Sequence, residues 1–388
     1  MLLEARLRPL VSLRHFRQFR SDRVGPEGIH EYQVARRDLA SEEVRVRVAA
    51  VGLNYRDRAL QDGSYLPQMP RPFVPLSEGS GVVLETGRDV VDLEVGQPVL
   101  GHYTIDWISG AFRESYHASK LGGPGDGWLS EEVIVPRRAL VAVPSGWRLE
   151  EAAALAISGV TAWKSLGDLD ELQGRYLLLA GTGNVSLQAL QMAAAAGARP
   201  IVVTSRPALA SRLRDLGAVA VIGREGGAAD VASQVMAITE SVGVGRAIDV
   251  VGGQFLVDAI LPSMATNGHV ALVGFLESGR VEGDLVGPAI RKLLHLEGIS
   301  VGSRDDLEAM LRYMDRHGLR PAIGRRLRAD DLPEWLANGA VSSGLRSGTI
   351  GERRPSVGLS ATDPQDIDLE LGKTVVIMDQ RLAERIAE

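Results

Sequence analysis

The run of residues 176–198, YLLLAGTGNVSLQALQMAAAAGA, constrains the fold of this chain more than any other segment. It begins with a continuous apolar stretch, Tyr176–Ala180, which is typical of a strand buried on both faces. Gly181 then permits a tight turn, and Gly183 lets the backbone approach a pyrophosphate at the start of an alanine-rich helix. Ser186 replaces the usual third glycine and is small enough for close packing of helix on strand. This context predicts a dinucleotide-binding loop, with a structural glycine turn in another α/β fold as the alternative.

The end of the next predicted strand, Pro200–Thr204, indicates which dinucleotide binds. A site for NADH normally presents Asp or Glu there, for the ribose 2′-hydroxyl. This chain has Thr204, Ser205 and Arg206 instead, and hydroxyl and guanidinium groups suit a 2′-phosphate. The sequence therefore predicts NADPH as the cofactor. The alternative interpretation of Arg206 is a solvated loop residue.

Strands and helices alternate on either side of the glycine loop. Residues 150–166 are predicted as one helix before it, and strands follow at 200–204, 220–222, 247–251 and 269–274, with helices between them. This alternation predicts a parallel sheet with right-handed crossovers. We therefore expect the α/β class, with a doubly wound Rossmann domain over residues 149–300.

The first 148 residues have a different character. Val44–Leu53 (VRVRVAAVGL) alternates apolar and charged residues, which indicates a half-buried strand, and further β-like runs follow at 81–85, 98–101, 133–135 and 140–143. This part is predicted to be mainly β. Residues 340–369 are rich in Gly, Ser, Arg, Pro and Asp without periodicity, which predicts a flexible insertion, and 373–378 (KTVVIM) predicts a last strand.

Length, charge and cysteine content exclude several classes of protein. A chain of 388 residues exceeds one comfortable core and predicts two domains. The formal charge of −6 argues against a general nucleic-acid binder, and no run of about 18 apolar residues predicts a membrane span. Cysteine is absent, which excludes thiolate nucleophiles and cysteine-ligated zinc and fits a cytoplasmic protein. The arginine-rich N-terminus is interpreted as a lead-in rather than a transit peptide.

Short segments along the chain resemble, in order, those of the medium-chain dehydrogenase/reductase superfamily, on its zinc-free quinone oxidoreductase side. The matching segments include VGLNYRD (51–57), DGSY (62–65), PLSEGSGVV (75–83), EEAAALAISGVTAW (150–163), AGTGNVSLQALQMAAAAGA (180–198) and NGHVALVGF (267–275). The resemblance implies a GroES-like, β-rich catalytic domain formed by residues 1–148 and completed by residues 301–388. It also implies a homodimer that pairs edge strands, expected at His269–Gly274 and Ile299–Gly302.

The resemblance further indicates the chemistry. The positions of the catalytic zinc ligands in zinc-containing members fall on Asn54, Ser77 and Ile157, which form no plausible ligand set, so no metal is expected. Hydride transfer to a conjugated double bond or quinone needs no Lewis acid, but the resulting enolate needs hydrogen-bond donors and a proton. Tyr65 matches the tyrosine proposed as donor in some enoyl reductases, and Asn54 matches an asparagine near the nicotinamide. Packing of Tyr65 on nearby prolines and turn capping by Asn54 are the alternatives.

The cofactor site is expected to involve residues from several parts of the chain. Thr161 resembles the family threonine that lies against the cofactor, although a helix-interior threonine is the alternative. Arg224 stands where many relatives have a tyrosine near the adenosine, which adds positive charge. The full expected set is Asn54, Thr161, Gly181, Thr182, Gly183, Asn184, Val185, Thr204, Ser205, Arg206, Arg224, Gly252, Gly274 and Phe275.

These features predict an NADPH-dependent, zinc-independent oxidoreductase that transfers hydride to an activated C=C bond or a quinone in a small-molecule substrate. Two alternatives stay open. One is a carbonyl reductase resembling alcohol and aldehyde dehydrogenases. The other is a cofactor-binding biosynthetic protein without redox turnover, which the unusual segment 340–369 keeps under consideration. No pattern indicates the substrate itself.

Overall fold

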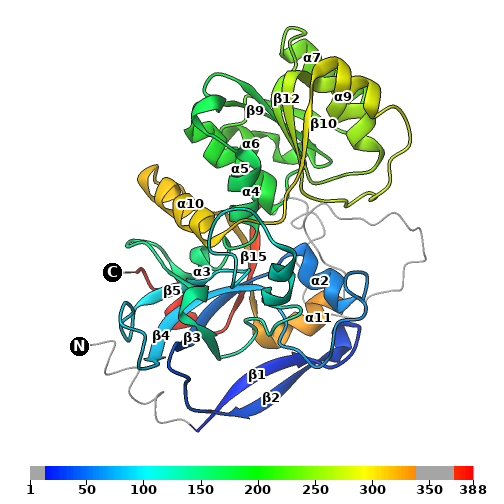
Figure 1. Ribbon diagram of the computed structural model, residues 1–388. Helices are drawn as coiled ribbons and strands as arrows, with labels where there is room; N and C mark the ends of the chain where they lie inside the picture. The colour runs from blue at the N-terminus through cyan, green and yellow to red at the C-terminus, as the bar shows by residue number, and fades with distance from the viewer. Residues whose placement is uncertain (1–13, 338–370, 388) are drawn as a thin grey trace. The chain divides into compact units, whose positions relative to one another are not determined.

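The computed structural model describes residues 14–337 and 371–387, and the predicted insertion at 340–369 lies outside this part of the chain (Figure 1). By its internal contacts, the described chain divides into two compact units. Of the described residues, the first contains 14–160, 302–337 and 373–387, and the second contains 161–301 and 371–372. Among these residues no helix is long and apolar enough to cross a membrane.

The second unit is built on a six-stranded parallel sheet. Its strands are β8 (Tyr176–Ala180), β9 (Arg199–Thr204), β10 (Ala220–Gly223), β11 (Val244–Asp249), β12 (Met264–Leu272) and β13 (His295–Gly298). They lie in the order β10-β9-β8-β11-β12-β13, and every pairing is parallel. This is the strand order of a dinucleotide-binding Rossmann fold, so the predicted fold class is confirmed.

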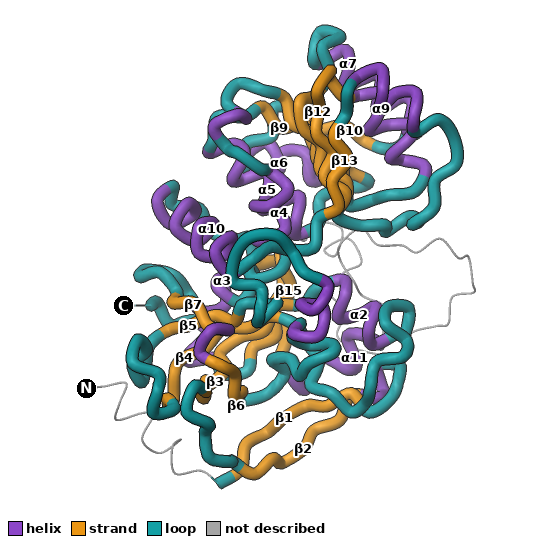
Figure 2. The backbone as a smooth tube through the Cα atoms, in the orientation of Figure 1, coloured by secondary structure: helices purple, strands orange, loops and turns teal. Residues whose placement is uncertain are grey.

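Helices cover both faces of this sheet. They are α5 (Asn184–Ala195), α6 (Ala210–Asp215), α7 (Ala228–Ile238), the π-helix η6 (Leu256–Ile260), α8 (Leu261–Ser263) and α9 (Val286–Lys292). Figures 1 and 2 show α5 and α6 on one side of the strands and α7 and α9 on the other. Because both faces are covered, the central strand β8 is apolar throughout, and Leu177, Leu178 and Leu179 are fully buried.

The first unit contains a seven-stranded sheet and a two-stranded ribbon. Its strands are β1 (His15–Ser21), β2 (Ile29–Ala35), β3 (Glu43–Gly52), β4 (Glu78–Thr86), β5 (Pro98–Gly101), β6 (Glu132–Pro136), β7 (Leu140–Ala142), β14 (Ile323–Arg328) and β15 (Lys373–Ile377). The large sheet runs β14-β15-β3-β4-β5-β7, with β6 also on β3, and β1 pairs with β2 and forms isolated bridges at Gln18 and Ser21. The helices are α2 (Tyr55–Gln61), α3 (Leu149–Ala152), α10 (Arg304–Arg316), α11 (Leu332–Ala337) and α13 (Gln380–Ala383). The last strand thus lies inside the sheet, between β14 and β3.

Two sequence predictions were wrong in detail. Residues 150–166 do not form one helix: α3 ends at Ala152 and α4 (Ser158–Leu166) begins after a turn that directs the Ile157 N–H to a buried carboxylate. The outer edge strand of the Rossmann sheet is His295–Gly298 rather than Ile299–Gly302. The backbone leaves the strand after its Ile299 N–H donates to the Leu272 carbonyl, and Val301 has a φ of 59°. Both deviations are set by tertiary contacts that apolar periodicity does not encode.

Candidate active site

The glycine loop lies where β8 ends and α5 begins. Gly181 has a φ of 108°, which only glycine adopts readily, and its N–H donates to the Val203 carbonyl at 2.8 Å. Gly183 is the residue before α5, and a Cβ added there would meet no atom within 4 Å. Asn184 and Val185 are the first two residues of the helix. The loop therefore leaves open space in front of a helix N-terminus, where backbone N–H groups favour a phosphate. Ser186 is buried, as its packing position predicts.

The strand order reverses between β8 and β11, and ligands of such sheets bind outside the carboxyl ends at that point. Asp249 ends β11, and its Oδ1 accepts N–H groups from Val251 at 2.9 Å and Gly252 at 3.0 Å. Burial raises the pKa of Asp249 above its ordinary value. The carboxylate shapes the turn that brings Gly252 beside the loop after β12.

Two glycines allow these neighbouring loops to pass each other. Gly252 has a φ of 67°, and a Cβ there would lie 2.8 Å from the Ser278 carbonyl oxygen. A Cβ at Gly274 would lie 2.7 Å from the Val250 carbonyl oxygen. Phe275 follows with its side chain exposed. The structure thus brings Gly252, Gly274 and Phe275 to the same edge of the sheet as Gly181.

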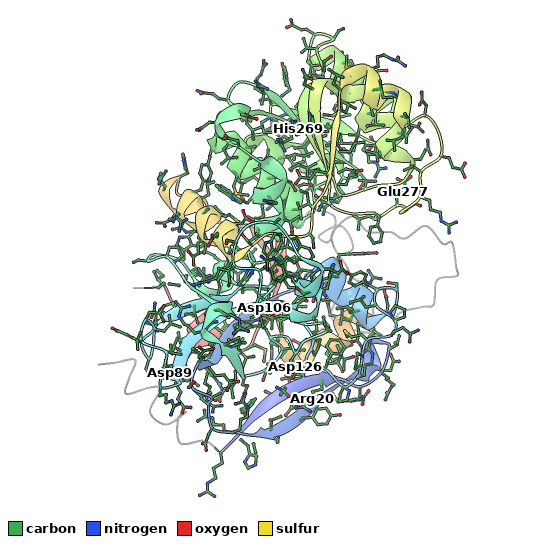
Figure 3. All side chains as sticks on the ribbon, in the orientation of Figure 1. Arg20, Asp89, Asp106, Asp126, His269 and Glu277 are labelled. Atoms are coloured by element: carbon green, nitrogen blue, oxygen red, sulfur yellow. The ribbon has the colours of Figure 1, made fainter. Side chains whose placement is uncertain are left out.

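Two arginines follow the ends of β9 and β10, and the first of them contacts the glycine loop. The Arg206 guanidinium donates to Thr182 Oγ1 at 2.9 Å, and its backbone N–H donates to Thr204 Oγ1 at 2.9 Å. The Arg224 N–H donates to the Thr204 carbonyl at 3.1 Å, and its guanidinium lies 4.5 Å from the Phe255 ring centroid. Arg224 also pairs at 3.3 Å with Glu277, which Figure 3 labels in the loop after β12, whereas Ser205 is exposed. The predicted adenosine end therefore carries two cations and one carboxylate.

Thr161 is buried within α4, and its carbonyl accepts the Ser165 hydroxyl at 2.7 Å. The structure thus places the predicted dinucleotide residues of the second unit around one sheet edge, with Thr161 on the helix that leads into that unit.

A buried charged network occupies the first unit. Lys373 Nζ lies 2.6 Å from Glu78 Oε1 and donates to Asn54 Oδ1 at 2.6 Å, while Asn54 Nδ2 donates to Glu78 Oε1 at 2.8 Å. Glu78 Oε2 accepts the Ile157 N–H at 2.7 Å. Because the ammonium can only donate and the carboxylate can only accept, these two partners fix the orientation of the Asn54 amide.

The sheet explains why these distant residues meet. Gly52, at the end of β3, is opposite Glu78 at the start of β4 and opposite Val375 in β15. A Cβ at Gly52 would lie 2.6 Å from Glu78 Oε1, so glycine makes room for the carboxylate. Lys373 and Glu78 side chains are fully buried, and such charges are stable only when they are paired and hydrogen-bonded.

Ser77 belongs to a second hydrogen-bonded group next to this network. Arg56 Nη1 donates to Ser77 Oγ, which in turn donates to Asp57 Oδ1. Asp57 Oδ2 accepts the Asn54 N–H at 2.9 Å, and burial raises the pKa of Asp57. Asn54, Ser77 and Ile157 stand where zinc-containing members are expected to have their catalytic zinc ligands. All three residues donate hydrogen bonds to carboxylates in this structure. Within residues 14–337 and 371–387, no group of three or more His, Cys, Asp or Glu side chains is placed to hold a metal ion.

Tyr65 lies in the loop after α2, where its N–H donates to the Ala59 carbonyl at 3.0 Å. Its half-exposed side chain lines a cavity of about 510 Å³ together with Pro67 and Pro70. The Arg56 guanidinium carbon lies 6.0 Å from the Tyr65 ring centroid. Tyr65 thus contributes to a cavity of the size that small ligands occupy, and it also packs near the prolines that the sequence singled out.

Sequence reasoning missed the groups that hold these residues in place: Glu78, Lys373, Asp57, Arg56 and Asp249. One signal was available for Glu78, because a carboxylate interrupts an otherwise small and apolar run, PLSEGSGVV. Lys373 is one of only four lysines in the chain and begins its last predicted strand. Neither signal identifies Asn54 as the residue that Glu78 and Lys373 contact, since Asn54 and Lys373 are 319 residues apart.

Comparisons with known proteins agree with this architecture. Residues 40–145 match the alcohol dehydrogenase GroES-like domain, and residues 185–316 match the family described as zinc-binding dehydrogenase. A zinc-type alcohol dehydrogenase-like protein of Schizosaccharomyces pombe is 31% identical, over 81% of this chain and 90% of its own length. A quinone oxidoreductase-like protein 2 homolog of Nematostella vectensis is 30% identical, over 67% of this chain and 66% of its own.

The solved structure of a Sinorhizobium meliloti protein, provisionally named alcohol dehydrogenase, superposes with a TM-score of 0.80 at 31% identity, covering 94% of this chain and 99% of the other. The chain also matches mycobacterial phenolphthiocerol synthesis polyketide synthases, but it spans only about a tenth of their length. A two-domain fold of this kind with a nucleotide loop defines a nicotinamide-dependent oxidoreductase. The chain belongs to the medium-chain dehydrogenase/reductase superfamily, as its sequence segments predicted.

Proposed function

We propose that this protein is an NADPH-dependent, zinc-independent reductase of activated C=C bonds or quinones. The observation that carries the proposal is the network at the zinc-ligand positions. There, Asn54 is held by Glu78 and Lys373, and Ser77 by Arg56 and Asp57. A lysine ammonium already balances the buried Glu78 carboxylate. The amide of Asn54 and the hydroxyl of Ser77 therefore suit hydrogen bonding to an anion better than coordination of a metal cation.

The second unit fits a nicotinamide dinucleotide. The open space at Gly183 would receive the pyrophosphate, and Thr204, Ser205, Arg206 and Arg224 would surround the adenosine ribose. When bound, this cofactor supplies a hydride to the substrate. A mycobacterial protein of the same fold, 20% identical, was solved in complex with NADPH.

The residues of the first unit would stabilise the negative charge that develops on the substrate and would supply a proton. Hydride addition to an enone or quinone leaves negative charge on the substrate oxygen, which hydrogen-bond donors stabilise. Tyr65 would donate such a bond or the final proton, and Asn54 would be the oriented amide beside the reacting group. Lys373 and Glu78 would act as positioning residues, because they fix which end of that amide is the donor.

Anaerobic oxidation of NADPH with a panel of quinones, enones, aldehydes and enoyl thioesters tests the proposal. Turnover with conjugated acceptors, unchanged by a chelator and with well under one zinc per chain, is expected. Turnover confined to aldehydes would favour the carbonyl-reductase alternative, which the name of the Schizosaccharomyces pombe relative also suggests. Binding of NADPH without any turnover would favour the non-redox alternative.

NADPH should bind at least about ten times more tightly than NADH, since a charge-assisted contact contributes about 1.5–3 kcal/mol and about 1.4 kcal/mol is tenfold. Calorimetric titration of both cofactors measures the ratio. Arg206→Met should bring the two affinities close together, mainly by weakening NADPH. Arg214→Met, which removes an exposed arginine of α6, is the matched control. Equal affinities in the unmodified protein would refute the predicted preference.

We further propose a homodimer formed through β13. All four residues of β13 are exposed, and its only partner among the described strands is β12. Exposed apolar side chains lie on β13 and the nearby α9 segment: Val286, Ile290, Leu293 and Leu296. Ile290→Glu should therefore shift the mass measured by light scattering from dimer to monomer, whereas Val219→Glu, before β10 at the opposite edge of the sheet, should not. A monomeric unmodified protein at micromolar concentration would contradict the proposal.

A further inference from the structure

The cavity beside Tyr65 has walls of two kinds. Most of its lining is apolar and comes from the loop after α2 and from two short segments later in the first unit: Leu66, Pro67, Met69, Pro70, Ala118 and Pro124. Its charged lining consists of Arg56 and Lys120, with His117 beside them. A volume of about 510 Å³ lies within the range of small-ligand sites. The cavity thus combines space for an apolar body with two fixed cationic groups.

Both cations contact the same aromatic ring. The Arg56 guanidinium carbon lies 4.9 Å from the Tyr103 ring centroid, and Lys120 Nζ lies 5.8 Å from the same centroid. Lys120 Nζ also lies 5.4 Å from the Phe112 ring centroid. Burial raises the pKa of Tyr103, so its phenol stays neutral and supplies no negative charge. The charge of Arg56 acts on Lys120, and a bound anion would offset this repulsion between like charges.

Among the residues that the structure describes, the carboxylates near these cations offset them only in part. Asp57 Oδ1 is 3.9 Å from Arg56 Nη1, but Asp57 already accepts bonds from Ser77 and Asn54. Glu114, a carboxylate that acts on Lys120, is almost fully exposed and therefore strongly screened. Burial, reinforced by the charge of Arg56, lowers the pKa of Lys120 to about 8. At neutral pH the cavity wall therefore carries positive charge that a bound anion would stabilise.

We infer that this cavity binds the carboxylate end of an apolar small molecule, with Arg56 and Lys120 holding the carboxylate and the proline-rich wall holding the hydrocarbon. This inference rests on the proposed function, because the carboxylate would be a second group of the substrate. The carbonyl that activates the reducible double bond would be a separate group of the same molecule. Arg56 already donates to Ser77 and to the Leu121 and Gly123 carbonyls, so few donors remain. A carboxylate needs fewer donors than a phosphate, and the apolar wall favours the smaller charge.

Binding of hexanoate and of its neutral analogue hexanamide at pH 7 tests the inference without any redox step. Hexanoate is expected to bind at least about tenfold more tightly, the effect of one charge-assisted contact. Lys120→Met should bring the two affinities together, and Lys120→Arg should restore the difference. Arg88→Met, which removes a cation whose side chain is 86% exposed, should change neither affinity.

A second readout follows from the lysine content. With only Lys120, Lys164, Lys292 and Lys373 in the chain, protein labelled with ¹³C-lysine gives few side-chain signals to assign. The Lys120 signal should titrate near pH 8, and saturating hexanoate should raise that midpoint, while the Lys164 signal should be unaffected. Inorganic phosphate should leave the Lys120 midpoint nearly unchanged.

Three results would overturn the inference: equal affinity for hexanoate and hexanamide, an undiminished preference in Lys120→Met, or phosphate binding as tight as hexanoate. Its failure is distinguishable from failure of the proposed function. If enones are reduced but hexanoate is not preferred, the carboxylate subsite alone is wrong. If hexanoate binds through Lys120 but no conjugated acceptor is reduced, the proposed reaction alone is wrong.

Discussion

Tyr65→Phe is expected to lower turnover of a conjugated substrate by about 10²–10⁴-fold while NADPH affinity stays nearly unchanged. Phenylalanine keeps the ring that lines the cavity and removes only the hydroxyl. If that hydroxyl stabilises or protonates the enolate, its loss affects the chemical step and not the cofactor loop in the second unit. Turnover and NADPH affinity should be measured on the same sample, with thermal melting to check the fold.

Tyr32→Phe is the matched control, because Tyr32 lies on β2 and its side chain is 39% exposed, against 36% for Tyr65. It should leave both properties unchanged. Thr161 and Gly183 variants should instead weaken cofactor binding first. Unchanged turnover in Tyr65→Phe, on a confirmed substrate, would remove Tyr65 from the mechanism and leave solvent as the proton source.

Lys373→Met should destabilise the first unit by about 3–5 kcal/mol, the usual cost of removing one partner from a buried ion pair. Among the described residues, the substitution leaves the buried Glu78 carboxylate with the Asn54 amide and the Ile157 N–H as its remaining donors. Urea unfolding followed by tryptophan fluorescence measures the loss. Four of the five tryptophans, Trp107, Trp128, Trp147 and Trp335, belong to the first unit, so the signal reports mainly on it.

Two further variants identify the cause of that loss. Adding Glu78→Gln to Lys373→Met removes the stranded charge and should recover part of the stability. Arg88→Met, which breaks an exposed pair with Asp89, should cost less than about 1 kcal/mol. A Lys373→Met protein as stable as Arg88→Met would show that the buried pair contributes little to this fold.

The Rossmann unit could be predicted from sequence because its information is local. Apolar runs such as Tyr176–Ala180 give a buried strand, and the adjoining Gly181 and Gly183 give the turn before α5. The edge of the same sheet could not be predicted as well. The strand β13 reads HLEG and is exposed throughout, so it has no apolar pattern. The sequence instead predicts the edge strand at the more apolar Ile299–Gly302.

The polar network of the first unit could be predicted even less. Asn54 was singled out from the segment VGLNYRD, but its partners lie 24 and 319 residues away and reach it only because β4 and β15 flank β3. Similarly, one helix was expected over 150–166, and the break before α4 exists because Glu78 takes the Ile157 N–H. These contacts could not be predicted because the residues that form them are far apart in sequence, although the local pattern around each residue is clear.

The position of β15 between β14 and β3 also bears on how the protein is made. During translation, Glu78 leaves the ribosome nearly 300 residues before the lysine that neutralises it, and the whole Rossmann unit is synthesised in between. Until residue 373 emerges, the nascent first unit has an unpaired sheet edge at the end of β3, Ala50–Gly52, and a buried carboxylate without its lysine partner. The Rossmann unit, whose strands are contiguous in sequence, can fold first. The first unit can be completed only after its C-terminal strand β15 has been synthesised.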